Sequence, residues 1–179
     1  MKATGIVRRI DDLGRVVIPK EIRRTMRIRE GDPLEIYTAS DGEVIFKKYS
    51  PIGELSPLAV QFADALAKHT PFAVVVCDRD HCVAAAGISK KEVLERRVAD
   101  SLEEIMESRR TFILQDISQK RTALEGIERY IAVAAPIISA GDITGAVVLL
   151  CTDEATLPAE SDCKMVQVAA NFLAKQMEE

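Results

Sequence analysis

Apolar and polar side chains alternate in short runs over the first fifty residues, and these runs predict β-strands. Pro19 closes the second run and is suited to open a short helix over residues 20–26, in which Ile22 and Met26 share one face. The last two runs flank Ser40-Asp41-Gly42, and Asp-Gly between alternating runs is a strong hairpin signal. The predicted order is strand, strand, short helix, strand, strand, with the strands over 4–10, 15–18, 34–38 and 43–48.

This first unit is too small to be stable as a single copy. Fifty residues of short strands bury too little apolar surface. The sequence shows no disulfide or metal pattern that would hold them together, so oligomerisation is the remaining device. We therefore predict at least a dimer, in which two copies interleave their strands into one barrel.

Basic side chains gather in the same unit and indicate its partner. Residues 1–29 hold nine lysines and arginines against three carboxylates, a net charge of +6. The whole chain carries −4, so the other 150 residues carry −10. Such asymmetry indicates an interaction surface, and arginine binds phosphates and guanine edges through paired hydrogen bonds. DNA is favoured over the alternative, in which these arginines only form a solvated helix face.

Four sequence motifs in this unit resemble the AbrB-type transition-state regulators of spore-forming bacteria. The resemblance implies a swapped-hairpin β-barrel homodimer that binds double-stranded DNA with low sequence stringency. Antitoxins share this fold, which leaves open the alternative that the unit binds a protein partner. The motifs lie at residues 4–10, 14–19, 21–24 and 34–37. The DNA contacts implied by the resemblance are Arg8, Arg15, Arg23 and Arg24, with Arg9 and Lys2 as weaker candidates.

The remainder of the chain predicts an α+β domain that resembles a GAF- or PAS-like sensor. We favour GAF because helices bracket the strands at both ends. The predicted organisation is a DNA-binding domain over 1–50, a linker over 51–54 and a sensor and oligomerisation domain over 55–179. The predicted elements are a helix over 55–68, strands over 72–77 and 82–86, two helices within 90–108 that start at Ser89 and Ser101, a strand over 111–114, a polar loop or lid over 115–128, strands over 129–138 and 144–151, and a helix over 162–177.

An AbrB-type head joined to such a domain resembles transcription factors that activate and repress genes late in sporulation. This resemblance implies a DNA-binding regulator located on the nucleoid of the forespore. The sequence has no apolar run of eighteen residues and no signal peptide at Met1, so we expect a cytoplasmic protein without a membrane partner.

Catalytic and metal-binding patterns are absent from the sequence. The chain has two histidines and four widely spaced cysteines, with no C-x-x-C pair and no glycine-rich phosphate loop. We predict no enzyme activity, no metal and no cofactor, and we expect the cysteines to be free thiols. Two interpretations of the second domain stay open: it binds an unidentified small molecule between its sheet and residues 87–128, or it serves only for oligomerisation. The end helices are expected to pair between chains and to join two dimers into a homotetramer.

Overall fold

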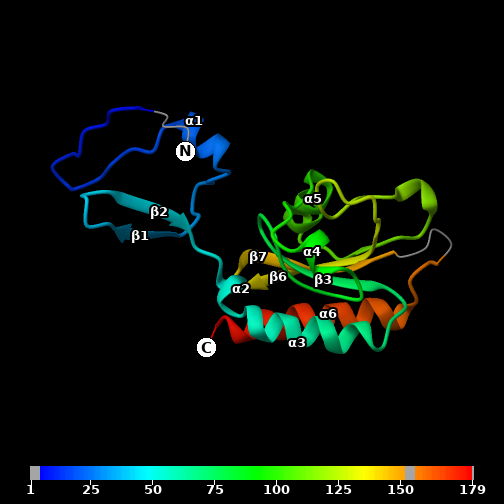
Figure 1. Cartoon of the computed structure of the whole chain (residues 1–179). Helices are drawn as coiled ribbons and strands as arrows, with labels where there is room; N and C mark the ends of the chain where they lie inside the picture. The colour runs from blue at the N-terminus through cyan, green and yellow to red at the C-terminus, as the bar shows by residue number, and fades with distance from the viewer. Residues whose placement is uncertain (1–4, 152–155, 179) are drawn as a thin grey trace. The chain divides into compact units, whose positions relative to one another are not determined.

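The computed structural model describes residues 5–151 and 156–178 and divides into two compact units, residues 1–49 and 50–179. Figure 1 shows the first unit in blue and cyan and the second from cyan to red. No helix among the described residues has the length and hydrophobicity that a membrane span requires.

The first unit contains one short helix and one hairpin. The helix is α1 (Lys20–Thr25), and the hairpin joins β1 (Leu34–Thr38) to β2 (Val44–Lys48) in antiparallel register, with Ile36 opposite Phe46. Gly42 adopts a φ of +87° in the turn, a conformation that glycine reaches without a steric penalty. The predicted hairpin and helix are confirmed.

The end of α1 is fastened to the hairpin through Lys48. The Nζ atom of Lys48 donates a 2.8 Å hydrogen bond to the carbonyl oxygen of Arg27. Its ammonium group also lies 3.9 Å from a carboxylate oxygen of Asp32, which accepts a 2.8 Å bond from the backbone N–H of Arg29. The hairpin therefore fixes the position of the helix that carries the paired arginines.

The strands predicted over 4–10 and 15–18 do not form in this single chain. Residues 5–10 and 15–18 belong to no helix or strand. They are joined by a turn in which the N–H of Gly14 bonds to the carbonyl oxygen of Asp11 at 3.0 Å. The prediction was wrong for one chain because a strand needs a neighbouring strand for its backbone hydrogen bonds, and the described part of one chain supplies none there.

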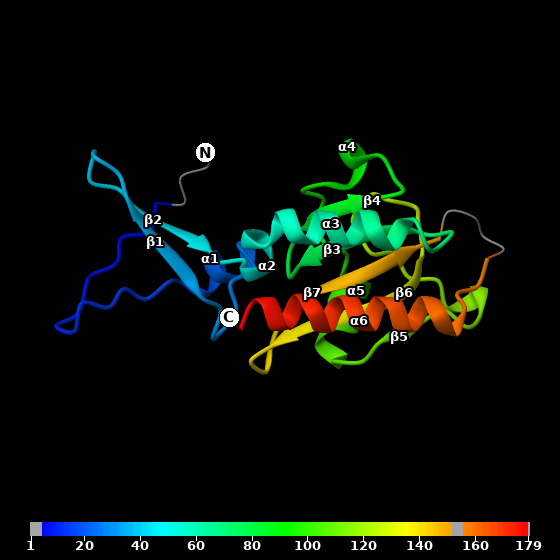
Figure 2. The ribbon, with the colours of Figure 1, turned by 90° about the horizontal axis from the view of Figure 1, so that it is seen from below.

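The second unit is built on a five-stranded antiparallel sheet in the order β4-β3-β7-β6-β5. Figure 2 shows α3 and α6 side by side on one face of the sheet, and Figure 1 shows α4 and α5 on the other face. The strands are β3 (Ala73–Asp78), β4 (Cys82–Ala86), β5 (Phe112–Ile113), β6 (Ile131–Ser139) and β7 (Asp142–Leu150). The helices are α2 (Pro51–Glu54), α3 (Ser56–Ala67), α4 (Lys90–Val93), α5 (Asp100–Ser108), the 3-10 turn η1 (Ile117–Gln119) and α6 (Glu160–Gln176).

Alternate residues of the central strands fill two separate cores. Val74 and Val76 of β3 face α3 and α6, whereas Val75 and Cys77 face α5. All four are fully buried. Because both faces of these strands are covered, successive positions along them are apolar, which explains the continuous apolar runs in the sequence.

Two local predictions differ from the structure. Residues 51–54, expected to be a linker, form α2, because Ile52 is fully buried and the Ser50 hydroxyl accepts a 3.1 Å hydrogen bond from the N–H of Gly53. The helix expected to start at Ser101 begins at Asp100 instead, and the Ser101 hydroxyl donates a 2.7 Å bond to the carbonyl oxygen of Thr122. In the first case the burial of Ile52 makes a helix out of residues expected to be a linker. In the second, the Ser101 hydroxyl bonds to a distant carbonyl oxygen instead of capping the helix.

Candidate nucleic-acid interface and clefts

The helix α1 presents its two arginines differently. Arg24 is exposed, as predicted, but Arg23 is half-buried rather than turned fully outward. The Nε atom of Arg23 is buried and has no hydrogen-bond partner among the described residues. A buried N–H normally has a partner, so this atom indicates an acceptor beyond the described residues.

Arg15 lies beside the turn that ends the extended segment. Its Nε atom is 2.8 Å from a carboxylate oxygen of Asp11, and hydrogen bonds from the backbone and side chain of Arg15 lower the pKa of that carboxyl group. The Arg15 side chain remains 71% exposed, and solvent screens an exposed ion pair of this kind. The guanidinium group can therefore exchange Asp11 for a phosphate at little cost.

The other candidate arginines, Arg8 and Arg9, lie on the exposed segment before the turn. Apolar side chains on both sides of the turn are also unusually open to solvent, such as Val7 at 91% and Val17 at 72%. An apolar surface of this extent marks an interaction site on a protein. The segment therefore combines cations with an uncovered apolar face. Lys2, the sixth candidate, lies outside the described residues.

The four cysteines lie in the second unit and are buried. Cys77 and Cys82 are opposite each other across β3 and β4, and both are fully buried. The hydrogen bond with Cys82, together with burial and the nearby Asp78, raises the pKa of the Cys77 thiol well above its ordinary value. A protonated, inaccessible thiol is neither a nucleophile nor a metal ligand. Within the described ranges, no group of three or more His, Cys, Asp or Glu residues is arranged to hold a metal ion.

The space between the sheet and α5 is filled by side chains. Leu102, Met106 and Leu124 are each at most 2% exposed there and pack against the sheet. The part of this space that lies directly between the sheet and α5 is thus occupied by the core, and clefts lie at its edge. The two interpretations of the second domain therefore both stay open.

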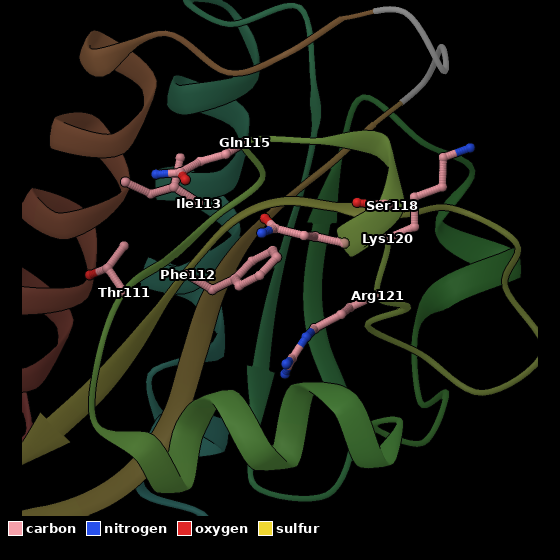
Figure 3. Close-up of a pocket in the computed structure, with 8 residues that line it drawn as sticks. Thr111, Phe112, Ile113, Gln115, Ser118, Lys120 and Arg121 are labelled. Carbon is pink, nitrogen blue, oxygen red and sulfur yellow. The ribbon is translucent and has the colours of Figure 1, made fainter.

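One rim cleft, of about 580 Å³, lies between β5 and η1, and Figure 3 shows its lining. The sequence predicted a polar loop or lid over residues 115–128 and did not single out Lys120 or Arg121, although two adjacent cations are visible in that segment. A second open cleft of about 660 Å³ lies beside the start of α5. The first cleft is lined by Thr111, Phe112, Ile113, Gln115, Ser118, Gln119, Lys120 and Arg121.

Both parts of the chain match known protein-family models. Residues 54–178 match the family described as stage V sporulation protein T C-terminal, transcription factor. Residues 7–53 match the family described as antidote-toxin recognition MazE, bacterial antitoxin.

Two Bacillus subtilis (strain 168) proteins show how far the likeness extends. The chain is 50% identical to stage V sporulation protein T over 181 residues, which cover the whole of both proteins. It is 63% identical to the transition state regulatory protein AbrB over 51 residues, which are 28% of this chain and 52% of that protein. The AbrB likeness of the first unit, expected from its motifs, is confirmed.

The fold of the second unit is that of a GAF domain. The GAF domain of a phosphoenolpyruvate-protein phosphotransferase from Coxiella burnetii matches with a TM-score of 0.57 and 17% identity, covering 69% of this chain and 82% of that chain. The predicted preference for GAF is therefore confirmed, and this likeness concerns the fold alone.

Proposed function

Because the chain belongs to the stage V sporulation protein T family of transcription factors, we propose that it binds double-stranded DNA and regulates sporulation genes. It acts on late genes as both activator and repressor, on the nucleoid of the forespore. The observation that carries the proposal is the basic segment and helix of the first unit, joined to a GAF-fold unit. Transcript levels in a strain lacking the protein would test the sign of regulation, since changes in one direction only would contradict a dual role.

The DNA-binding form is a homodimer with swapped hairpins. In support, residues 5–10 and 15–18 belong to no strand in the described chain, and this segment is rich in exposed apolar side chains. The partner copy supplies the neighbouring strand that one chain lacks, and it also provides acceptors for the buried Nε atom of Arg23. The dimer then presents two copies of each arginine to the duplex.

The DNA contacts come from the segment over residues 5–18 and from α1. In that segment the exposed arginines are Arg8, Arg9 and Arg15, and on the helix Arg24 is exposed. Lys2 is proposed as a sixth contact on the basis of the sequence resemblance alone. Arg23 is half-buried and positions the helix as well as contacting DNA.

A double substitution on α1 tests the proposal directly. We expect Arg23→Ala/Arg24→Ala to weaken binding of the full chain to duplex DNA by about tenfold or more, because four cations are lost per dimer. If all four contact phosphates, the slope of log K against log salt becomes shallower by about 3–4 units. Fluorescence anisotropy on AT-rich and GC-rich duplexes at several salt concentrations measures both quantities.

The matched control removes the same charge elsewhere. Lys90 and Lys91 are exposed on α4 of the second unit, so Lys90→Ala/Lys91→Ala is expected to leave the salt slope unchanged. Equal losses for both double variants would mean that net charge, rather than the α1 surface, sets the affinity. Absence of wild-type binding at low salt would reject the proposal.

Two such dimers associate into a homotetramer through α3 and α6. In support, Val168 on α6 remains 65% exposed, so this part of the helix surface is open to contact with another chain. We expect Val168→Asp to convert the full chain from four copies to two, because a carboxylate would be buried in the contact. Light scattering at tens of micromolar measures the mass. A wild-type dimer, or a variant that stays tetrameric, would contradict this arrangement.

A protein partner for the first unit is the second candidate function, favoured by the MazE match over residues 7–53. In this alternative the exposed apolar side chains of 5–18 contact a different protein. The DNA titration distinguishes the two, since a protein-binding unit would not show a steep salt-dependent affinity for duplexes.

A further inference from the structure

The guanidinium group of Arg121 lies over the ring of Phe112 in the cleft between β5 and η1. Its central carbon is 5.4 Å from the ring centroid, and Figure 3 shows the two side chains adjacent. An arginine placed over an aromatic face keeps its N–H donors at the edge of its plane. This geometry holds the cation in place while leaving donors for a ligand.

Arg121 already has one partner in the structure, Glu104, but this contact leaves most of its N–H donors available to a ligand. One terminal nitrogen lies 3.4 Å from a carboxylate oxygen of Glu104, whose side chain is 72% exposed. A long, solvent-exposed contact of this kind contributes little and is easily exchanged. Arg121 itself is 41% exposed, so an incoming anion can reach it.

The charge of the lining selects for an anion. The cleft contains two cations and no carboxylate among its eight lining residues. Figure 3 shows Lys120 turned away from Phe112, and its ammonium group lies 4.3 Å from the Tyr130 ring, so Arg121 is the cation that faces the cleft. The neighbouring cleft has the opposite character, since it is lined by Asp100, Glu125 and Glu128 without a cation.

The remaining walls suit a molecule with an apolar part. Ile113 is 37% exposed beside Phe112, while Gln115 and Ser118 offer neutral polar groups. A volume of about 580 Å³ falls within the range of small-molecule sites, about 300–1,000 Å³. A bare inorganic ion would leave the apolar wall unused.

From these features we propose that the cleft between β5 and η1 binds a small organic carboxylate. Its carboxylate accepts hydrogen bonds from Arg121, and its apolar body lies against Phe112 and Ile113. The cleft also touches α6, because the Gln167 amide donates a 3.2 Å hydrogen bond to the hydroxyl of Thr111. Binding at this site is the signal that the second unit senses. This regulatory role rests on the proposed function, whereas the binding itself does not.

Methyl spectroscopy of the full chain tests binding directly. The probe is 3-phenylpropionate, titrated into protein labelled at the isoleucine δ1 methyl groups. We expect saturable shifts at Ile113, in the lining, and at Ile117, in η1, without shifts at Ile52 in the other core. The neutral 3-phenylpropanamide is expected to bind about tenfold or more weakly, since a hydrogen-bonded charge pair is lost.

Variants at one position separate the charge from the fork-shaped guanidinium group. Arg121→Gln is expected to weaken binding of the probe by about tenfold to a hundredfold. Arg121→Lys is expected to lose less affinity than Arg121→Gln, but still to bind more weakly than the wild type. Arg96→Gln is the matched control, because Arg96 is exposed and lies next to Gly126 of the other cleft. It should leave probe affinity unchanged.

Three outcomes would overturn the proposal: equal affinity for the acid and its amide, equal affinity of wild type and Arg121→Gln, or equally tight binding of inorganic phosphate. The titration contains no DNA, so its failure leaves the proposed DNA binding intact. Conversely, a chain that fails to bind DNA can still bind the probe.

Discussion

Replacing Val17 with aspartate is expected to abolish both the dimer and the binding of DNA. In a single chain Val17 is 72% exposed, and a polar substitution at such a site changes stability by about 0.5 kcal/mol or less. In a swapped dimer the same side chain is covered by the partner copy, and an unpaired buried carboxylate costs several kcal/mol. We expect a loss of about 3–5 kcal/mol in dimer formation, or about a hundredfold to several thousandfold.

Analytical ultracentrifugation and the DNA titration together measure this effect. Leu157→Asp is the matched control, because Leu157 is 51% exposed in the second unit and lies outside the proposed contacts. A Val17→Asp protein that remains dimeric and binds DNA like the wild type would reject the swapped arrangement. Equal damage from both variants would point to general misfolding instead.

Replacing Gly145 with alanine is expected to destabilise the second unit by about 3 kcal/mol, because the sheet has no room for a methyl group there. Gly145 lies in β7 opposite Asp78 of β3, and a Cβ atom would collide with the carbonyl oxygen of Cys77. Backbone atoms of a central strand cannot move aside without breaking the ladder. Thermal unfolding followed by circular dichroism should show a midpoint lower by about 10 °C.

Gly126→Ala controls for the loss of glycine itself. Gly126 has a φ of +74°, and the nearest atom to an added Cβ is a terminal nitrogen of Arg96 at 3.8 Å. Its substitution therefore costs only the strain of the left-handed conformation, about 1–2 kcal/mol. If the two variants unfold within 2 °C of each other, the close approach at Gly145 does not matter for stability.

Local signals explain the parts of the fold that could be predicted. Asp41-Gly42 fixes a turn through the conformational freedom of glycine, so the hairpin followed from a few neighbouring residues. The helical spacing from Met165 to Leu173 and the apolar runs of β3 and β7 also act within one segment. These features depend on backbone propensity and periodicity, which operate over a short stretch of chain.

The candidate site could be predicted only where it lies in one segment. The cluster of arginines in residues 8–24 is visible as a charge asymmetry. The AbrB likeness, which four motifs in this unit suggested, is confirmed by the 63% identity over 51 residues. The half-buried state of Arg23 could not be foreseen, because helical geometry gives the direction of a side chain and not what covers it.

The sequence by itself determined the two-part organisation, the basic first unit and the sequence of secondary-structure elements in the second. Tertiary structure alone decided that residues 5–18 find no strand partner in the described chain, that Ile52 turns an expected linker into a buried helix, and that Arg121 lies over Phe112 beside a cleft. The physical reason is common to all three. Pairing, burial and stacking join residues that are distant in sequence or belong to another copy, and no local pattern encodes which surfaces meet.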